Sequence, residues 1–166
     1  MRDSKLTPSS KKPFVMHAPD ALTPDDHPHE SRKTHISVKG RDIALTPRAG
    51  LSLALAMHEL ASNAAKYGAL STPSGRLFVS WNIGHAPHRT LNFVWAESGG
   101  PPLEGPPPQR GFGTTLIERT LTHEFDAEVN REFLRSGLRC TIDLPLTSEF
   151  GDVQPFGMSE GETRWR

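Results

Sequence analysis

The chain has 166 residues and a formal net charge of +0, so one domain is expected and the charge balance gives no reason to expect binding to nucleic acid or anionic membranes. Its one cysteine, Cys140, lies in a strand-like run, which excludes a disulfide framework and favours a buried structural thiol. No apolar stretch is long enough to span a bilayer and the N-terminus lacks a signal-peptide core, so we expect a cytoplasmic protein without membrane insertion.

The composition divides the chain into three parts. Residues 1–33 mix Pro, Ser, Lys, Asp and His without periodicity, and we expect this N-terminal segment to be mostly disordered. Residues 34–39 then alternate as a short strand. Residues 147–166 are expected to form a flexible tail, so the folded domain is expected to span residues 34–146.

The clearest element is a helix predicted over residues 47–67. Thr46 is a suitable N-cap, Pro47 suits the first helical position, and Gly68 fits a left-handed C-terminal residue. Apolar residues at spacings of three and four form one stripe along this helix, namely Leu53, Met57, Leu60 and Ala64.

Three polar side chains lie beside that stripe. At about 100° per residue, Glu59, Asn63 and Lys66 fall within an arc of roughly 60°. A carboxylate, a carboxamide and an ammonium on one flank of an apolar helix indicate a site for a magnesium-bound phosphate ester. The same pattern also fits a core helix whose polar residues only face water, so other motifs must decide.

Two glycine motifs follow the helix. A strand predicted over residues 90–95 is followed by Glu97, whose carboxylate could accept a hydrogen bond from an exocyclic amine, and by Gly99, which would let a flat ring approach the backbone. Residues 111–113, Gly-Phe-Gly, open into a helix predicted over residues 114–125, whose first N–H groups attract anions. Each motif taken alone also fits an ordinary glycine-containing turn between two elements.

The remaining elements complete a fold class. Strands are predicted over residues 75–83, 127–134 and 138–144, and residues 103–110 form a Pro-rich loop between the two glycine motifs. Helices that alternate with mostly hairpin-linked strands predict an α+β fold. We expect a two-layer sandwich in which one mixed, mostly antiparallel sheet is covered on one face by helices.

The order of these motifs resembles the N box, G1 box and G2 box of the ATP-binding domain of sensor histidine kinases. That domain has the Bergerat-type fold of the superfamily that includes gyrase, Hsp90 and MutL. Within this group the sequence is similar to the HWE histidine kinases, which are named after a His in the N box and a Trp-x-Glu in the G1 box. All three letters are present here, as His58, Trp95 and Glu97. The resemblance covers residues 34–146.

The resemblance implies roles for individual residues. Asn63 would ligate Mg²⁺ through its side-chain oxygen, Lys66 would neutralise phosphate charge, and Tyr67 would help to wall the nucleotide. Glu97 stands where other histidine kinases carry the Asp that binds the adenine amino group. The resemblance also places a further set of residues against the nucleotide: Gly99, Gly111, Gly113, Thr114, Thr115 and Thr141.

Two neighbouring residues are the catalytic candidates. Glu59 matches the general base of gyrase-like relatives, and in a kinase it would orient or deprotonate the accepting imidazole. His58 is the second candidate, although it points away from Glu59 on the helical wheel, and a helical His more often packs or supports a neighbour. By resemblance, residues 103–110 would form the ATP lid.

A histidine kinase also needs a helical hairpin that dimerises and carries the phosphoaccepting His. Residues 1–33 contain too many prolines for a long helix and show no heptad pattern. We therefore expect a catalytic domain that positions MgATP for transfer to a His on a separate or missing acceptor domain, with a response regulator as the next partner in two-component signalling. A homodimer is expected only through that missing domain. Two alternatives remain: a stand-alone protein Ser/Thr kinase of the anti-sigma-factor type, and a non-catalytic ATP-responsive binding module.

Overall fold

The computed structural model describes residues 14–18, 35–84, 89–106, 112–147 and 151–152. Within these ranges, helix α1 spans Pro47–Tyr67 and helix α2 spans Phe112–Phe125. A short 3-10 turn, η1, follows α1 at Ala69–Ser71. No helix of the described chain is both long and apolar enough to cross a membrane.

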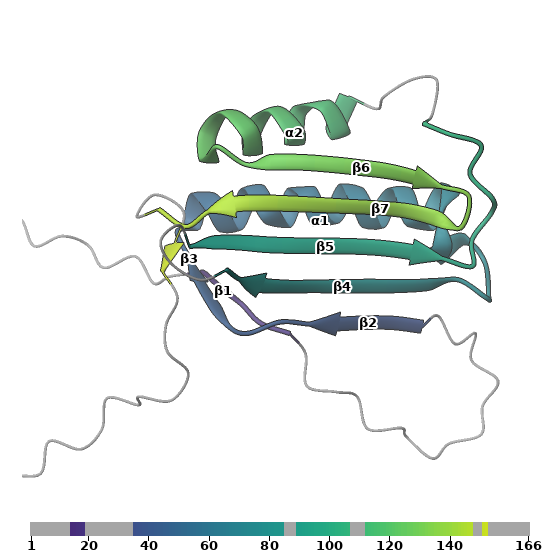
Figure 1. Ribbon diagram of the computed structural model, residues 1–166, viewed down its shortest axis with the longest axis horizontal. Coiled ribbons are helices and arrows are strands. Elements are labelled where there is room, and N and C mark those ends of the chain that lie inside the picture. The colour runs from purple at the N-terminus through teal and green to yellow at the C-terminus, as the bar shows by residue number, and fades with distance from the viewer. Residues whose placement is uncertain (1–13, 19–34, 85–88, 107–111, 148–150, 153–166) are drawn as a thin grey trace, which may run out of the picture.

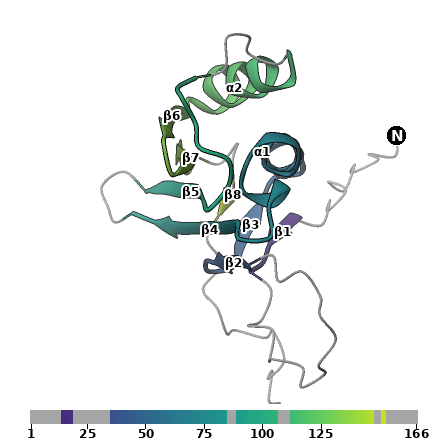
Figure 2. The ribbon, with the colours of Figure 1, turned by 90° about the vertical axis from the view of Figure 1, so that its right-hand side faces the viewer.

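Five strands form the main sheet in the order β2-β4-β5-β7-β6. Strand β2 pairs in parallel with β4, whereas the other neighbouring pairs are antiparallel. Both helices cover the same face of this sheet (Figures 1 and 2). The predicted α+β sandwich with a mixed, mostly antiparallel sheet is therefore confirmed. The strand bounds are His35–Lys39 for β2, Arg76–Ile83 for β4, Thr90–Ser98 for β5, Glu128–Leu134 for β6 and Gly137–Pro145 for β7.

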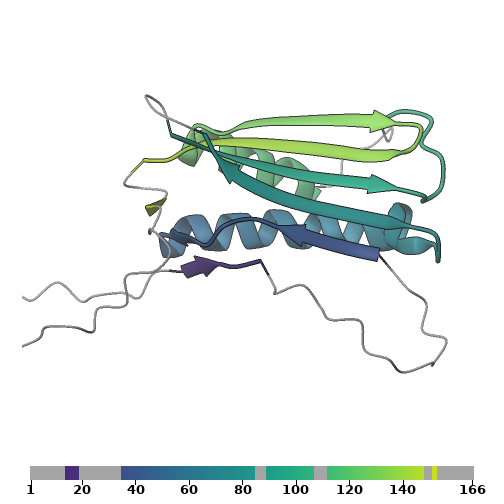
Figure 3. The ribbon, with the colours of Figure 1, turned by 60° about the horizontal axis from the view of Figure 1, so that its bottom comes forward.

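A second, small sheet was not predicted. Strands β1 (Phe14–Met16), β3 (Ile43–Leu45) and β8 (Gly151–Asp152) pair antiparallel in the order β1-β3-β8. Figure 3 shows β1 beside the first part of α1, where Gly50 leaves room for the Phe14 ring. Strands of two or three residues are too short to show an alternating pattern in the sequence.

Strands β1 and β8 lie within residues 1–33 and 147–166, the two segments expected to be mostly disordered or flexible. Pairing with β3 supplies the backbone hydrogen bonds that neither segment could satisfy alone. Most of the remainder of both segments lies outside the described residues.

Helix α1 begins and ends where predicted. The Thr46 hydroxyl oxygen accepts a hydrogen bond from the Ala49 backbone N–H at 3.3 Å, and Pro47 is the first helical residue. In the predicted stripe, Leu53, Leu60 and Ala64 are buried, and Met57 is partly buried against the core. Burial of a side chain such as Leu53 stabilises the fold by about 1.5–3 kcal/mol.

Gly68 differs from its prediction. Its backbone is extended, with φ −111° and ψ −151°, rather than left-handed. A glycine is needed here because of close packing and not because of backbone conformation. A Cβ at this position would lie 2.0 Å from the Glu97 Oε2 atom. Gly68 thus lets the end of α1 approach strand β5 closely.

Two predicted boundaries shift around the glycine motifs. Strand β5 continues to Ser98, because it stays paired with β4 up to the Arg76–Ser98 partners, so Glu97 lies in the strand rather than after it. Helix α2 begins at Phe112, which places Gly113 inside its first turn instead of before the helix.

Candidate functional site

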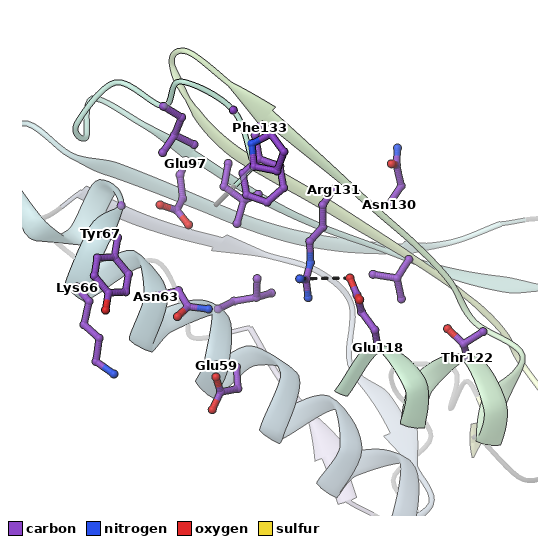
Figure 4. A pocket seen from close by; sticks show the side chains of 17 residues that line it. Glu59, Asn63, Lys66, Tyr67, Glu97, Glu118, Thr122, Asn130, Arg131 and Phe133 are labelled. Carbon is purple, nitrogen blue, oxygen red and sulfur yellow. Dashed lines mark ion pairs between the residues drawn. The ribbon is translucent and has the colours of Figure 1, made fainter. Parts of the chain in front are cut away.

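A cavity of about 890 Å³ lies between α1, α2 and the helix-covered face of the sheet. Its wall includes residues of α1, β5, α2, β6 and β7, together with the first part of the loop after β5 (Figure 4). That loop contributes Leu103, Gly105 and Pro106, and the rest of the predicted lid at residues 107–110 lies outside the described residues. A cavity of this size falls in the range of about 300–1,000 Å³ that is typical of small-molecule sites.

The polar flank of α1 forms one side of this cavity. Glu59, Asn63, Lys66 and Tyr67 all line it, and Figure 4 shows their side chains along the same stretch of the helix. Glu59 and Asn63 are partly buried, whereas Lys66 is exposed and Tyr67 is 70% exposed. All four line the same cavity, because residues three and four apart share one helix face, and their roles toward a nucleotide stay predictions. We call these four residues the α1 edge.

Glu97 forms a corner at the other side of the cavity. The side chain is only 8% exposed, and its Oε2 atom accepts a hydrogen bond from the Ala69 backbone N–H at 2.8 Å. Its Oε1 atom accepts a second hydrogen bond from the indole N–H of Trp95 at 2.9 Å. A carboxylate offers about four lone-pair sites, so this one can still accept from a ligand. We call Glu97, Ala69, Trp95 and Gly68 the Glu97 corner.

Gly99 adopts a backbone conformation that favours glycine and packs against the segment before β4. Its φ is +71°, and a Cβ there would lie 2.5 Å from the Ser74 carbonyl oxygen. The Gly99 carbonyl accepts hydrogen bonds from the hydroxyls of Thr72 at 2.9 Å and Ser74 at 3.0 Å. Gly99 is not among the residues that line the cavity, and these contacts give it a structural role, so the expected approach of a flat ring to this glycine stays a prediction.

Two other candidates also lie away from the cavity. Thr141 is on β7, where Leu138, Cys140 and Ile142 alternate onto the helix-covered face, so Thr141 faces the opposite side of the sheet. The expected contact between Thr141 and adenine is therefore corrected. His58 is exposed on α1 and is likewise absent from the cavity wall, as its wheel position suggested.

The G2-like motif can be placed only in part. Gly111 lies outside the described residues, and Gly113 and Thr114 belong to the first turn of α2, where the structure describes their backbone alone. Thr115 is partly buried in the same turn and does not line the cavity. The proposed phosphate contacts of this motif stay predictions.

An ion pair in the cavity was missed by the sequence analysis. The Arg131 Nη1 atom lies 3.2 Å from the Glu118 Oε1 atom, which joins β6 to α2 across the cavity (Figure 4). The buried Nε atom of Arg131 forms no hydrogen bond within the described part of the chain. Alternation along β6 puts Val129, Arg131 and Phe133 on the inner face, and this was the available signal.

Cys140 lies behind this ion pair and is buried, as expected. Burial raises the pKa of the Cys140 thiol above its ordinary value of 9.0, while the neighbouring Arg131 guanidinium opposes the shift and Glu118 adds to it. The thiol is therefore kept protonated and unreactive in the folded chain. Within the described ranges, no three His, Cys, Asp or Glu side chains gather in a way that could hold a metal ion.

Comparison with curated proteins finds relatives that are named blue-light-activated histidine kinases. The chain is 36% identical over 149 residues to blue-light-activated histidine kinase 1 of Erythrobacter litoralis, a match that covers 83% of this chain and 40% of that protein. It is 36% identical over 115 residues to the blue-light-activated histidine kinase of Brucella anthropi, covering 69% of this chain and 23% of that protein. The chain thus spans less than half the length of these relatives. No protein-family model matches it.

Solved structures agree on the fold. The histidine kinase domain of the Erythrobacter litoralis EL346 blue-light-activated histidine kinase superposes with a TM-score of 0.58 at 19% identity, covering 70% of this chain and 53% of that chain. A structure of the EL346 protein itself gives a TM-score of 0.55 at 20% identity, covering 68% of this chain and 35% of that chain.

Proposed function

Because this chain belongs to the HWE histidine kinases through its ATP-binding domain, we propose that it binds ATP with Mg²⁺ and transfers the γ-phosphoryl group to a His side chain on a separate acceptor domain. One observation carries the proposal: Glu59, Asn63 and Lys66 of α1 and Glu97 of β5 line the same cavity. The acceptor domain and its response regulator belong to the proposal as partners.

The dimensions of α1 suit a nucleotide that lies along the helix. From Glu59 to Tyr67 the helix axis advances about 12 Å, at about 1.5 Å per residue. The base would lie at the C-terminal end of α1, where the Glu97 carboxylate can accept a hydrogen bond from the adenine amino group. The phosphates would then run toward Asn63 and Glu59, with the Lys66 ammonium neutralising part of their charge.

The α1 edge also fits a magnesium ion. Mg²⁺ prefers hard oxygen ligands and is usually held by one or two protein groups together with substrate phosphates and water. Asn63 offers a carboxamide oxygen on the cavity wall, and Glu59 lies one helical turn away on the same face. When bound, the ion would neutralise charge on the phosphates during transfer.

Catalysis would come mainly from positioning, since phosphoryl transfer needs little covalent chemistry from the protein. Glu59 lines the cavity at the end where the terminal phosphate is proposed to lie. Its carboxylate would accept the imidazole N–H proton of the acceptor His, or hold that ring in line with the phosphate. His58 has no part in this proposal, because it lies outside the cavity wall.

The test is transfer of labelled phosphate from ATP. The full chain is incubated with γ-labelled ATP, Mg²⁺ and candidate acceptor proteins, with the Asn63→Ala chain as the matched control. We expect a label that depends on Mg²⁺ and Asn63 and that is lost in acid but kept in base, as phosphohistidine is. An acid-stable label would instead support a Ser/Thr kinase, and saturable ATP binding without any transfer would support a binding module.

A further inference from the structure

The Glu97 corner contains a side chain that the proposed nucleotide does not touch. Trp95 is only 2% exposed and does not line the cavity, yet its indole N–H donates to the Glu97 carboxylate at 2.9 Å. We propose that Trp95 is a positioning residue, which fixes Glu97 so that its free lone pairs select a purine with an exocyclic amine at position 6. This inference rests on the proposed function of the same site.

The strand geometry brings the two side chains together. Residues two apart in a strand point to the same face, so Trp95 and Glu97 both face the helices from β5. The indole N–H reaches one carboxylate oxygen, and the Ala69 backbone N–H reaches the other at 2.8 Å. The two donors approach from different elements, β5 and η1, and together they fix the plane of the carboxylate.

Close packing leaves the carboxylate little other room. A Cβ on Gly68 would lie 2.0 Å from Glu97 Oε2, and a Cβ on Gly137 would lie 3.2 Å from the Glu97 Cβ atom. Other histidine kinases are expected to carry Asp at the position of Glu97, and Glu has one more rotatable bond than Asp. The rotation of each such bond must be restricted before the carboxylate has a defined direction toward a ligand. Trp95 supplies a donor that holds this longer side chain.

A fixed carboxylate discriminates between purines. It rewards a ligand N–H donor, such as the 6-amine of adenine, and repels an acceptor, such as the 6-keto oxygen of guanine. Without the indole N–H, Glu97 would retain only the Ala69 donor, and the plane of its carboxylate could rotate within the same tight space. The structure therefore predicts that loss of the Trp95 N–H weakens recognition of the amine specifically.

The test crosses a protein change with a ligand change, as in a double-mutant cycle. Trp95→Phe keeps an aromatic ring and removes the N–H, and purine riboside triphosphate is ATP without its 6-amine. Calorimetric titration in Mg²⁺ should show ATP binding weakened about tenfold, the effect of one hydrogen bond to a charged group. Affinity for purine riboside triphosphate should change by less than about twofold, because that ligand offers no amine to Glu97.

Trp81→Phe is the matched control. Trp81 lies on the neighbouring strand β4 and is also buried, at 4% exposure. Its indole N–H donates a hydrogen bond to the Arg41 carbonyl oxygen at 2.7 Å. This control removes the same atoms and a comparable hydrogen bond without touching Glu97. It should leave the ratio of ATP to purine riboside triphosphate affinity as in the parent chain.

The possible outcomes separate the two proposals. A parent chain that binds no ATP overturns the proposed function, and this inference falls with it. A parent chain that prefers ATP, with a Trp95→Phe chain that keeps the same preference or loses both ligands equally, overturns this inference alone. If Trp95→Phe does not fold, 3-benzothienylalanine at position 95 keeps the shape of the indole without its N–H, and the same two affinities decide.

Discussion

The two sides of the cavity hold their polar groups in opposite ways. At the Glu97 corner, a strand carboxylate is 8% exposed and accepts hydrogen bonds from two N–H donors. At the α1 edge, Glu59 and Asn63 are only partly buried, Lys66 is exposed, and no hydrogen bond or ion pair joins the side chains of these three to another described residue. The corner is preorganised and the edge is open.

This difference matches what each side would bind. A neutral base is recognised by geometry, so its acceptor gains from being fixed in a dry place. Phosphates and Mg²⁺ carry their own water and charge, and groups on an open helix face can adjust to them. In the proposed complex the sheet would therefore determine which base fits, and the helix would provide the charge.

The largest effect is expected at the α1 edge, from Glu59→Gln. This change keeps the shape and removes the proposed base, so phosphate transfer to the acceptor should fall by about 10² to 10⁴. ATP affinity and stability should stay close to those of the parent, because Glu59 is partly exposed and outside the apolar stripe. Single-turnover transfer assays measure the rate, and equal rates for both chains would remove Glu59 from the mechanism.

Asn63→Ala should act through the metal. In Mg²⁺, ATP affinity should fall by at least the roughly 10- to 100-fold that loss of a metal-supporting group costs. In EDTA the two chains should bind ATP alike, which separates a metal ligand from a nucleotide contact. Asn82→Ala, at an exposed asparagine of β4, is the control. Calorimetric titration provides each affinity, and an Asn63 effect that persists in EDTA contradicts the assignment.

At the Glu97 corner, Glu97→Gln should destabilise the fold, unlike the same change at Glu59. The two N–H donors reach different oxygens of the carboxylate, so in a carboxamide the donor-only NH2 group would face either the Ala69 or the Trp95 N–H. One buried donor loses its partner, at a cost of about 1–3 kcal/mol in the free energy of unfolding. Urea denaturation of both variants is the measurement, and equal stabilities would show that the corner is not preorganised.

Gly68→Ala probes the same corner from the helix side. The added Cβ would lie 2.0 Å from Glu97 Oε2 and 3.0 Å from the Ala64 Cα atom, so the carboxylate must move. We expect a loss of about 1 kcal/mol in unfolding free energy together with weaker ATP binding. Gly84→Ala is the control, since its Cβ meets no described atom closer than 3.7 Å. A Gly68→Ala chain that matches this control would mean that the corner is loosely packed.

The smallest expected effect is a pH dependence of stability that comes from the buried Cys140 thiol on the sheet. Burial raises the pKa of the Cys140 thiol above 9.0, so above that pH the unfolded chain loses a proton that the folded chain keeps. Stability should therefore fall as the pH rises through 9.0 toward the higher folded pKa, by at most about 1.4 kcal/mol per pH unit. Cys140→Ala should flatten this slope, measured by urea denaturation between pH 8 and pH 10. An unchanged slope would assign the pH dependence to other groups.

The sequence by itself determined the local elements and one side of the site. Helix periodicity places Glu59, Asn63 and Lys66 on one flank of residues 47–67, because a single helix fixes their relative directions. The cap at Thr46 and the strands that follow show their own local signals, and most of the sheet was predicted for that reason.

Only the tertiary structure decided what faces that helix. Strand pairing extended β5 to include Glu97, and the alternation of β7 turned Thr141 to the opposite face. The approach of α1 to β5 gave Gly68 its role, and the Arg131–Glu118 pair depends on two elements that meet across the cavity. Contacts between distant segments depend on register and packing, and no local pattern of residues encodes either.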